Sequence, residues 1–350
     1  MRLTTIPAFL LQVALAGMLV QPAFPASPEL KFKPDGTFKI LMVSDLHFTP
    51  QPDAASIALA EKLIDIEKPD LMVIAGDAIS GKSCTTPDEL KKAISNVAAA
   101  PEKKKVAWAV AFGNHDEEHF PKTGLTKGEM MKLYEAYPCN VNSGWVPGIH
   151  GVGNKSLVIQ DAAAAKPIFV VWLIDSGDYI KIPDNNYEWI HADQVFWYYQ
   201  TSSSLEKTFG HNIPGLMIFH IPLPEFQEMV NSRKTIGERH EPEAPSKVNG
   251  GLFAAVLDRG DVKGIFCGHD HTNNYMGIWR GVALGYDGSA GHQAYPHIKT
   301  DDAGNNRARG GRVFLIRESD PWQFKTWMRF KDGSANWEST SESLTQDQLK

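Results

Sequence analysis

The sequence VAWAVAFGNHD at residues 106–116 is the most informative part of the chain, because an apolar run passes directly into Gly, Asn, His and Asp. A short apolar run that ends in turn-forming residues is typical of a buried strand. The residues after it, Asn114, His115 and Asp116, carry side chains that can bind metals or transfer protons. They stand where the carboxyl end of a strand in an open α/β sheet presents its ligands.

Four further apolar runs end in the same way, each followed by Asp or His residues. They are FKILMV at 38–43, LMVIA at 71–75, LMIF at 216–219 and VKGIFC at 262–267. If these strands lie side by side, their polar ends meet at one edge of a sheet. The candidate metal ligands at these ends are Asp45, His47, Asp77, Asn114, His220, His269 and His271. This set of oxygen and imidazole ligands is large enough for two metal ions.

The segments between the first three runs, residues 54–67 and 87–99, read as helices. Strand–helix–strand alternation predicts parallel strands joined by right-handed crossovers, so the fold class is α/β. The later part of the chain predicts strands at 156–160 and 168–175, helices at 192–209 and 252–259, a polar surface loop at 237–250, and strands at 276–279, 282–286, 312–317 and 323–329. We expect those last four strands to pair antiparallel and close a second sheet. One domain would cover residues 35–330, followed by a loose polar tail at 331–350.

The composition is that of an ordinary globular protein, with 43% hydrophobic and 22% charged residues among 350. The formal net charge is −6 and no dense stripe of Lys and Arg is present, so a nucleic acid is not an expected partner. The three Cys residues form no CxxC pattern, which argues against thiol-based zinc or redox chemistry. Cys84 and Cys139 could pair in an oxidising compartment, whereas Cys267 ends a predicted strand and is expected to be buried.

Residues 1–26 differ from the rest of the chain and resemble a secretory signal peptide. Arg2 is the only charged residue before Glu29, and an apolar stretch at 6–20 is followed by Ala23 and Ala26, after either of which cleavage could occur. A membrane anchor is the alternative, but the stretch is shorter than the roughly 20 residues that a membrane span needs. We therefore expect a secreted or periplasmic protein, with no stable membrane insertion after cleavage.

The five runs occur in the order Asp-x-His, Gly-Asp, Gly-Asn-His-Asp, a single His and Gly-His-x-His. This order resembles the pattern of the calcineurin-like metallophosphoesterase superfamily. The resemblance implies a four-layer α/β/β/α sandwich with two mixed sheets. It also implies a dinuclear metal centre at which a metal-bridging hydroxide attacks the phosphorus of a phosphoester. Imidazole and carboxylate ligands suit Zn, Mn or Fe, as divalent or mixed-valence ions, better than Ca or Mg.

The family pattern also implies roles for individual residues. One metal would be held by Asp45, His47, Asp77 and His271, and the other by Asp77, Asn114, His220 and His269. His115 would not be a ligand; it resembles the histidine that stabilises the phosphoryl group or protonates the leaving oxygen. Asp116 would orient His115 through a hydrogen bond, or would serve only to structure the loop.

Further runs resemble the purple acid phosphatase-related branch of the superfamily. They are LIDSGDY at 173–179, QVFW at 194–197, HIPLPE at 220–225 and GHQAY at 291–295. In true purple enzymes a Tyr in Gly-Asp-x-x-Tyr binds ferric iron, and Ser80 stands at that place here. A coloured iron–tyrosinate centre is therefore not expected.

The favoured interpretation is a phosphoesterase that acts on a small-molecule phosphoester or a phosphoprotein. The alternative is a catalytically degenerate metal-binding protein of the same fold. A metallo-β-lactamase-type hydrolase is not favoured, because the chain has no His-x-His-x-Asp-His run. Among nearby residues, His292 could touch substrate or face solvent, the run at 117–119 (Glu-Glu-His) is expected to face water, and Asp175 is expected to cap a turn.

Overall fold

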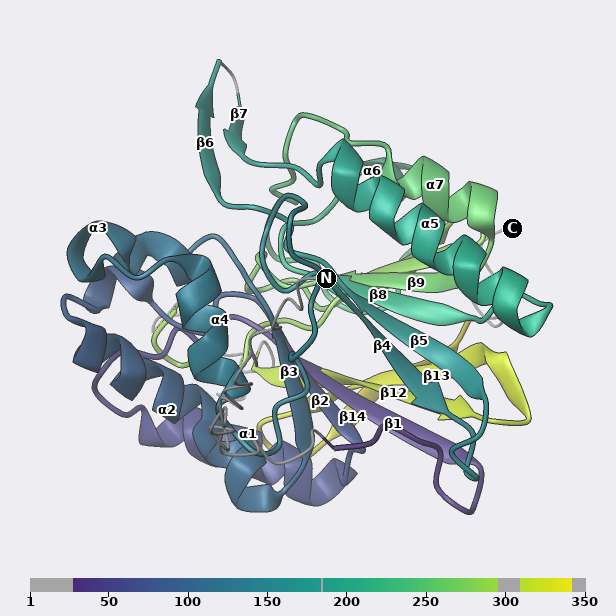
Figure 1. Cartoon of the computed structure of the whole chain (residues 1–350), viewed down its shortest axis with the longest axis horizontal. Helices are drawn as coiled ribbons and strands as arrows, with labels where there is room; N and C mark the ends of the chain where they lie inside the picture. The colour runs from purple at the N-terminus through teal and green to yellow at the C-terminus, as the bar shows by residue number, and fades with distance from the viewer. Residues whose placement is uncertain (1–27, 184, 295–308, 342–350) are drawn as a thin grey trace, which may run out of the picture.

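Two six-stranded sheets face each other, and helices cover the outer face of each (Figure 1). The computed structural model describes residues 28–183, 185–294 and 309–341. Both sheets contain parallel and antiparallel pairs of strands. The arrangement is the four-layer α/β/β/α sandwich that the sequence predicts.

The first sheet has the strand order β14-β13-β12-β1-β2-β3. Its strands are β1 (Thr37–Val43), β2 (Leu71–Ala75), β3 (Ala107–Ala111), β12 (Gly310–Arg317), β13 (Asp320–Phe330) and β14 (Ala335–Thr340). Strands β1, β2 and β3 are parallel, and helices α1 (Ala54–Glu67) and α2 (Pro87–Lys104) connect them. Each helix starts at a side-chain cap, because Asp53 accepts hydrogen bonds from two amides of the first turn of α1 and Thr86 from one of α2.

The second sheet has the strand order β10-β11-β9-β8-β5-β4. Its strands are β4 (Lys155–Gln160), β5 (Pro167–Leu173), β8 (Gly215–Phe219), β9 (Val262–Cys267), β10 (Met276–Trp279) and β11 (Val282–Tyr286). The central strands β5, β8, β9 and β11 are parallel, and β4 and β10 flank them as antiparallel edges. Helices α5 (Ala192–Phe209), α6 (Glu225–Ser232) and α7 (Leu252–Arg259) cover its outer face (Figure 1).

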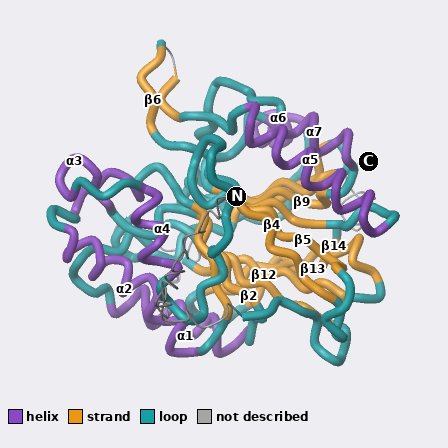
Figure 2. Tube along the Cα trace, in the orientation of Figure 1, coloured by secondary structure: helices purple, strands orange, loops and turns teal. Residues whose placement is uncertain are grey.

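Smaller elements complete the fold beside the two sheets. Helices α3 (Phe120–Thr123) and α4 (Lys127–Glu135) follow β3, and short 3-10 helices lie at Gly81–Ser83 and Asp116–His119. Strands β6 (Tyr179–Ile182) and β7 (Asn185–Tyr187) form a separate two-stranded hairpin. This hairpin, which we call the arm, projects from the body of the protein (Figure 2).

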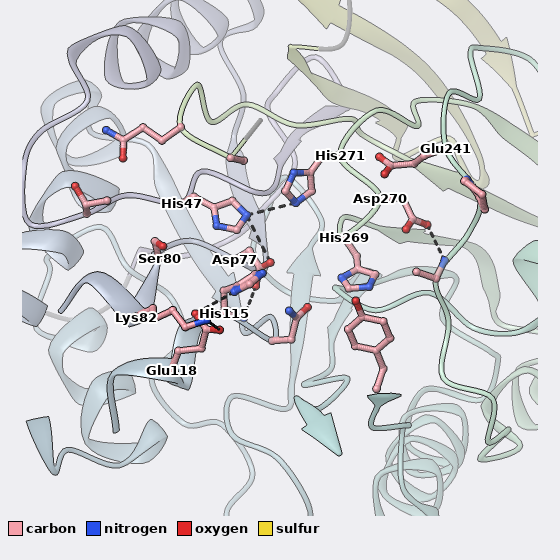
Figure 3. A pocket seen from close by; sticks show the side chains of 17 residues that line it. His47, Asp77, Ser80, Lys82, His115, Glu118, Glu241, His269, Asp270 and His271 are labelled. Atoms are coloured by element: carbon pink, nitrogen blue, oxygen red, sulfur yellow. Dashed lines mark hydrogen bonds and ion pairs between the residues drawn. The ribbon is translucent and has the colours of Figure 1, made fainter. Parts of the chain in front are cut away.

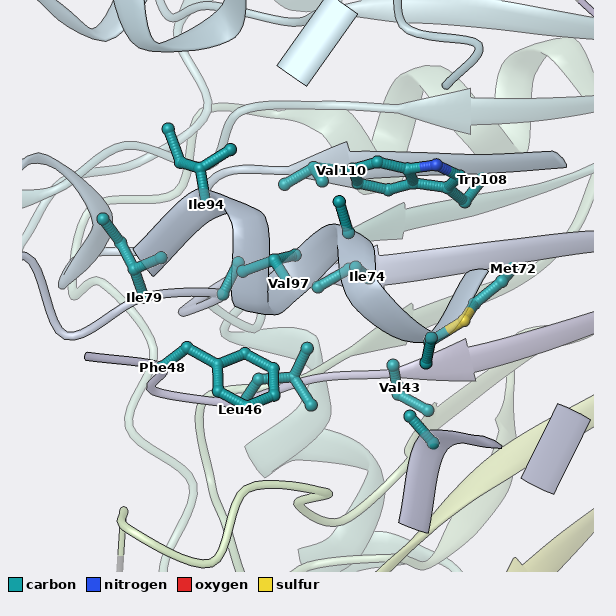
Figure 4. Packing of buried hydrophobic residues seen from close by; sticks show 14 of the residues in the cluster. Val43, Leu46, Phe48, Met72, Ile74, Ile79, Ile94, Val97, Trp108 and Val110 are labelled. Carbon is teal, nitrogen blue, oxygen red and sulfur yellow. The ribbon is translucent and has the colours of Figure 1, made fainter. Parts of the chain in front are cut away.

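Three clusters of buried apolar side chains fill the spaces between the four layers. The first lies between the first sheet and helices α1, α2 and α4, where Ile74 and Val110 meet Ile94 and Val97 (Figure 4). The second lies between the two sheets, and the third between the second sheet and helices α5, α6 and α7. Each buried aliphatic side chain contributes roughly 1.5–3 kcal/mol to folding. The parallel strands are therefore fixed in place from both faces.

The last four predicted strands pair antiparallel as β10 with β11 and β12 with β13, which confirms that part of the prediction, but the two pairs belong to different sheets. Of the four strands expected to close a second sheet, only β10 and β11 belong to it, and β11 runs parallel to β9. Strands β12 and β13 extend the first sheet, because β12 pairs antiparallel with β1. This pairing protects an apolar edge of β1 that would otherwise be open to other chains. Local sequence patterns identify a strand but not its distant partner.

The C-terminal segment is also more ordered than the sequence predicts. Where a loose polar tail is expected from residue 331, the segment Ala335–Thr340 forms β14 and pairs with β13. An edge pairing rests on backbone hydrogen bonds, which the polar sequence ANWEST makes as well as an apolar one. The predicted signal peptide at 1–26 lies outside the described residues.

Two further observations concern cysteines and membrane spans. Cys84, Cys139 and Cys267 are free thiols, so the pairing considered for the first two is not formed, and Cys267 is buried as expected. Among the helices of the described ranges, none has the length and apolar character needed to cross a membrane.

Candidate metal centre

The carboxyl ends of β1, β2, β3, β8 and β9 meet at one place, and all seven candidate ligands follow these ends. Ligand atoms of Asp45, His47, Asp77 and His271 lie within 4.8 Å of one another, and all four residues are buried. His271 Nε2 lies 3.1 Å from Asp45 Oδ1, and His47 Nε2 lies 3.6 Å from Asp77 Oδ2. In Figure 3 the side chains of His47, Asp77 and His271 point into one space.

The other candidate ligands lie on the far side of Asp77. His220 Nε2 is 3.1 Å from Asp77 Oδ2 and 3.3 Å from His269 Nδ1. Asn114 is buried beside them at the end of β3. Asp77 Oδ2 therefore lies between two groups of ligands and is the atom that both groups share.

Four of these residues have left-handed backbone conformations. The φ angles of Asp45, His47, Asp77 and His269 are 53°, 47°, 47° and 76°. Such conformations cost about 1–3 kcal/mol each for a residue other than Gly and concentrate at functional sites. The backbone thus turns sharply after each strand and aims the ligand side chain at the centre.

Two glycines allow the ligands to approach so closely. A Cβ atom on Gly76 would lie 2.4 Å from the ring of His220, and Gly76 itself has φ +88°. A Cβ atom on Gly113 would lie 2.3 Å from Asp77 Oδ1. The Gly-Asp and Gly-Asn pairs of the sequence motifs therefore have a steric cause.

Hydrogen bonds orient the ligands from behind. The backbone carbonyl of Ala75 accepts from His220 Nδ1 at 2.8 Å, which leaves Nε2 as the nitrogen that faces the centre. Asp77 Oδ1 accepts from the amide of His115 at 2.8 Å. Asp45 Oδ2 accepts from Ser44 Oγ at 2.5 Å and from the amide of His269 at 3.1 Å. Each carboxylate thus uses one oxygen for the protein and turns the other inward.

Three buried oxygens in the centre, Asp45 Oδ1, Asp77 Oδ2 and Asn114 Oδ1, have no hydrogen-bond donor of acceptable geometry among the described residues. The nearest polar atoms to the two carboxylate oxygens are imidazole nitrogens: His271 Nε2 lies 3.1 Å from Asp45 Oδ1, and His220 Nε2 lies 3.1 Å from Asp77 Oδ2. Buried polar atoms without partners are rare in proteins and call for a specific explanation. Oxygen and nitrogen atoms that face a common point in this way fit a shared cation, and the mixed carboxylate, amide and imidazole set suits Zn, Mn or Fe.

The charges of the centre also fit a cation. Burial raises the pKa of Asp45, but the charge and hydrogen bond of His271 together with the charge of His220 outweigh burial, and the pKa falls to about 2. Burial lowers the pKa of His47 to about 4 and of His269 to about 3, so both imidazoles are neutral near pH 7. Burial also acts to lower the pKa of His220, but the charge and hydrogen bond of Asp77 together with the charge of Asp45 overcome burial and raise the pKa to about 10. The carboxylates therefore favour positive charge between them.

His115 lies beside the candidate ligands and is bound by a different carboxylate from the one predicted. His115 Nδ1 is 3.0 Å from Glu118 Oε2. Asp116 makes no such contact; it is buried and accepts from the amides of Gly113 and Ile79 at 2.7 and 3.0 Å. Its loop-structuring alternative is therefore the one observed, and the orienting role falls to Glu118.

Burial, nearby charges and the helical turn of this loop explain why Asp116 binds backbone amides and Glu118 contacts His115. Burial, followed by the nearby charge of Asp77, raises the pKa of Asp116 to about 7. Burial lowers the pKa of His115, but the hydrogen bond to Glu118 and the charge of Asp77 raise it above its ordinary value. The 3-10 helix Asp116–His119 brings residue 118 onto the face of residue 115, three positions earlier.

Other residues considered from the sequence have structural roles. His119 is buried and bonds Thr123 Oγ1 at 2.8 Å, so neither it nor Glu118 faces water as expected. His292 contacts Ser56 Oγ on α1 at 3.2 Å, and it neither lines the pocket nor points to open solvent. Asp175 accepts from the amide of Gly177 and pairs with Lys127, which confirms its structural role.

A cavity of about 480 Å³ opens above the candidate ligands. Five of the seven candidate ligands are among its lining residues, together with His115; the five are His47, Asp77, Asn114, His269 and His271. Ser80, Lys82, Glu118, Tyr187, Glu241 and Gln293 are among the residues of its walls. Lys82 is the only Lys or Arg among the described lining residues, so the walls carry little positive charge for a large polyanion.

Comparison with known proteins agrees with this geometry. The sequence model of the family described as Calcineurin-like phosphoesterase matches residues 38–273. Two Arabidopsis thaliana proteins named probable inactive purple acid phosphatase 29 and 14 are 32% and 34% identical, over 89% and 87% of this chain and 87% and 83% of their own. A dimetal phosphatase from Danio rerio has a similar fold, with a TM-score of 0.57 at 12% identity over 87% of this chain and 98% of that one. The chain therefore belongs to the calcineurin-like phosphoesterase family, in the branch related to the purple acid phosphatases.

Proposed function

We propose that the protein is a metal-dependent phosphoesterase with a dinuclear centre. Asp45, His47, Asp77 and His271 would hold one ion, and Asp77, Asn114, His220 and His269 the other. The observation that carries the proposal is the convergence of these side chains around three buried oxygens for which the described part of the chain supplies no hydrogen-bond donor of acceptable geometry. Two ions at such a centre would supply a water of lowered pKa and neutralise the charge of the phosphoryl oxygens.

The chain's own residues would bind the substrate and move the proton. Lys82, at the wall of the cavity, adds positive charge for the phosphate group. Glu118 accepts at Nδ1 of His115, which leaves Nε2 as the nitrogen that can exchange a proton with the leaving oxygen. The amide of His115 also holds Asp77 Oδ1, so the proton donor and the shared carboxylate are positioned together.

The alternative is a metal-binding protein of the same fold without catalytic activity. The names of the two Arabidopsis relatives, which contain the word inactive, favour it. The full ligand set and the open cavity above it favour the enzyme. Both alternatives predict metal binding, so only a measurement of turnover separates them.

The test is a panel of phosphomonoesters and phosphodiesters, with p-nitrophenyl phosphate and its diester as first probes, assayed after loading with Zn²⁺, Mn²⁺ or Fe. We expect hydrolysis by the loaded protein and none above background by Asp77→Asn, because the change removes the charge of the shared oxygen. Asp65→Asn, at an exposed carboxylate of α1 that pairs with Lys104 outside the cavity, would keep the activity and serve as control. A folded, metal-loaded protein without turnover on the whole panel would favour the alternative.

We further propose a small-molecule phosphoester or a phosphoprotein as substrate, and export of the chain through the signal-like segment at residues 1–26. The cavity and its few positive charges favour a substrate with one phosphate group at the reacting end over a polyanion such as nucleic acid. N-terminal sequencing of the exported protein should give a start after Ala23 or Ala26. Retention of residue 1 in protein from the native host would rule out cleavage.

A further inference from the structure

The arm contacts the candidate metal centre from above, although it projects from the body of the protein. Tyr179, the first residue of β6, is 46% exposed, yet its hydroxyl reaches two residues of the centre. Asn114 Nδ2 donates to this hydroxyl at 2.7 Å, and the hydroxyl lies 3.2 Å from His115 Nε2. No sequence motif of the metal centre includes Tyr179.

The hydrogen-bond donors and acceptors around the Tyr179 hydroxyl form one continuous chain of side chains. The amide NH₂ of Asn114 can only donate, so the Tyr179 oxygen accepts from it. The Tyr179 hydroxyl can serve His115 Nε2 in either protonation state: it donates to Nε2 when the ring carries its only proton on Nδ1, facing Glu118, and it accepts from Nε2 when the ring carries both protons. The chain then runs from Asn114 through Tyr179 and His115 to Glu118.

This chain fixes the direction of the Asn114 amide. With Nδ2 held by Tyr179, Oδ1 is turned to the opposite side, where it is buried and finds no hydrogen-bond donor among the residues that the structure describes. Oδ1 is the atom of Asn114 that a metal would bind, because an amide nitrogen has no available lone pair. Loss of the Tyr179 hydroxyl would allow the amide to rotate and would leave its NH₂ group without this partner.

We propose that Tyr179 is a positioning residue of the centre: its hydroxyl holds the Asn114 oxygen toward the second metal site and holds His115 Nε2 in place. This inference rests on the proposed dinuclear centre. Partners that orient metal ligands from behind commonly change metal affinity or activity by about 10- to 100-fold. Tyr179 would act through Asn114 and His115, without touching the metal.

The contacts of the arm support an effect on one half of the centre. The ring of Tyr179 lies edge-on to the ring of His115, with 5.8 Å between centroids. Tyr187, at the end of the arm, lies edge-on to His269 at 4.6 Å and beside Tyr179 at 5.6 Å. The two tyrosine rings thus cover Asn114, His115 and His269. None of the ring contacts of Tyr179 or Tyr187 in the described part of the chain involves the other metal group, Asp45, His47 or His271.

Hydrogen bonds at the base of the arm fix the position of Tyr179. Glu188, directly after β7, donates its amide to the carbonyl of Asp178 at 2.8 Å and accepts from the Asp178 amide at 3.1 Å. The other carboxylate oxygen of Glu188 contacts His150 Nε2 at 2.8 Å and His191 Nε2 at 3.3 Å. Since Asp178 precedes Tyr179, this anchor ties the position of the hydroxyl to the body of the protein.

The test is Tyr179→Phe, which removes the hydroxyl and keeps the ring, with Tyr199→Phe on the exposed face of α5 as matched control. Metal-free full-length protein is titrated with Zn²⁺ or Mn²⁺ by calorimetry. We expect the affinity for the second equivalent to fall about 10- to 100-fold while the first is unchanged. In the loaded enzyme kcat should fall more than KM rises, because the substrate cavity keeps its shape. The control should match wild type in every measurement.

A double variant makes the test specific. If Tyr179 acts through Asn114, then Tyr179→Phe in an Asn114→Ala background should weaken the second equivalent no further than Asn114→Ala alone. Equal weakening of both equivalents, or wild-type affinity together with wild-type kcat in Tyr179→Phe, would overturn the proposal. Wild-type protein that takes up fewer than two ions and hydrolyses nothing would refute the proposed dinuclear function itself, which is a distinguishable result.

Discussion

The floor of the cavity and the arm above it position their side chains by different means. The floor, defined as the seven candidate ligands, stands on the ends of five strands that are buried on both faces. The arm consists of two short strands outside both large sheets, and its side chains are largely exposed. The floor is therefore fixed by the global fold, whereas the arm depends on a few hydrogen bonds at its base. Substitutions at the floor should have large effects on metal affinity and kcat, and substitutions in the arm should have smaller effects on the same quantities.

The largest effect on turnover is expected at His115, which connects the floor to the arm. His115→Ala removes the ring that contacts Glu118 and Tyr179 but keeps the backbone amide that holds Asp77. We expect kcat to fall by about 10²–10⁴-fold, the usual size of a general acid or base contribution. Metal content, measured by elemental analysis, should remain at the wild-type value. Unchanged kcat would exclude His115 from proton transfer.

A pair of variants separates the two carboxylates near His115. Glu118→Gln should lower kcat by about 10- to 100-fold, the range for partners that orient a functional imidazole. Because Glu118 raises the pKa of His115, the limb of the pH–rate profile that reports His115 should move to lower pH. A profile identical to wild type would mean that Glu118 does not act on His115.

Asp116→Asn is the matched comparison, because it alters a carboxylate that binds two backbone amides. We expect a loss of about 1–3 kcal/mol in the free energy of unfolding, since a neutral amide is a poorer acceptor than a carboxylate and brings an NH₂ group that must itself be satisfied. The limb of the pH–rate profile that reports His115 should stay near its wild-type position. A shift as large as that of Glu118→Gln would restore the orienting role to Asp116.

The scaffold of the floor can be tested at Glu67, the last residue of α1. Its buried carboxylate accepts from Trp327 Nε1 at 2.9 Å and Arg329 Nε at 2.6 Å, and so ties α1 to β13. Burial raises its pKa, but these hydrogen bonds outweigh burial and lower it below the ordinary value. A lowered carboxyl pKa stabilises the fold above the unfolded-state pKa of about 4.3, and the contribution is lost as pH falls through the folded value.

Glu67→Gln should therefore lower the free energy of unfolding at pH 7 by about 1–3 kcal/mol. The difference from wild type should shrink as pH falls below about 4, where both side chains are uncharged. Urea denaturation at pH 7 and at acidic pH measures this. Glu61→Gln, at an exposed pair with Lys103, is the control and should change the unfolding energy by less than about 1 kcal/mol. If the unfolding energies of wild type and Glu67→Gln differed by the same amount at all pH values, the ionised carboxylate of Glu67 could not be the source of the difference.

The smallest effect is expected at the base of the arm. Glu188→Gln weakens the contacts to His150 and His191 but leaves the sheets untouched. Local openings cost much less than global unfolding, so hydrogen exchange should quicken in residues 178–188 while the global unfolding energy stays within about 1 kcal/mol of wild type. A loss of global stability as large as that of Glu67→Gln would show that the arm is part of the scaffold.

The floor was predictable from sequence, and the arm was not. Each ligand directly follows a buried strand, and both the apolar run and its polar end are local signals. Helices α1, α5 and α7 begin and end at the predicted residues for the same reason. Tyr179 ends the LIDSGDY run that resembles the purple acid phosphatase-related branch, but nothing in that run predicts its contact with Asn114, which spans 65 residues and depends on how the arm folds back.

Glu118 and the last strands were missed for two different reasons. Glu118 lies three residues after His115, a spacing that marks a shared face only if the loop is helical, and the loop was not predicted to be so. Strands β12 and β13 were recognised as strands, but the choice of β1 as partner is made by tertiary packing between distant segments. Local patterns therefore gave the elements and the ligands, whereas pairing and support came from the fold.

The most direct test of the account is a crystal structure of the metal-loaded protein with anomalous diffraction at the absorption edge of the bound metal. We expect two ions at the floor that share Asp77 as a ligand. One ion should also be bound by Asp45, His47 and His271, and the other by Asn114, His220 and His269. A single ion, or two ions that do not share Asp77, would contradict the account.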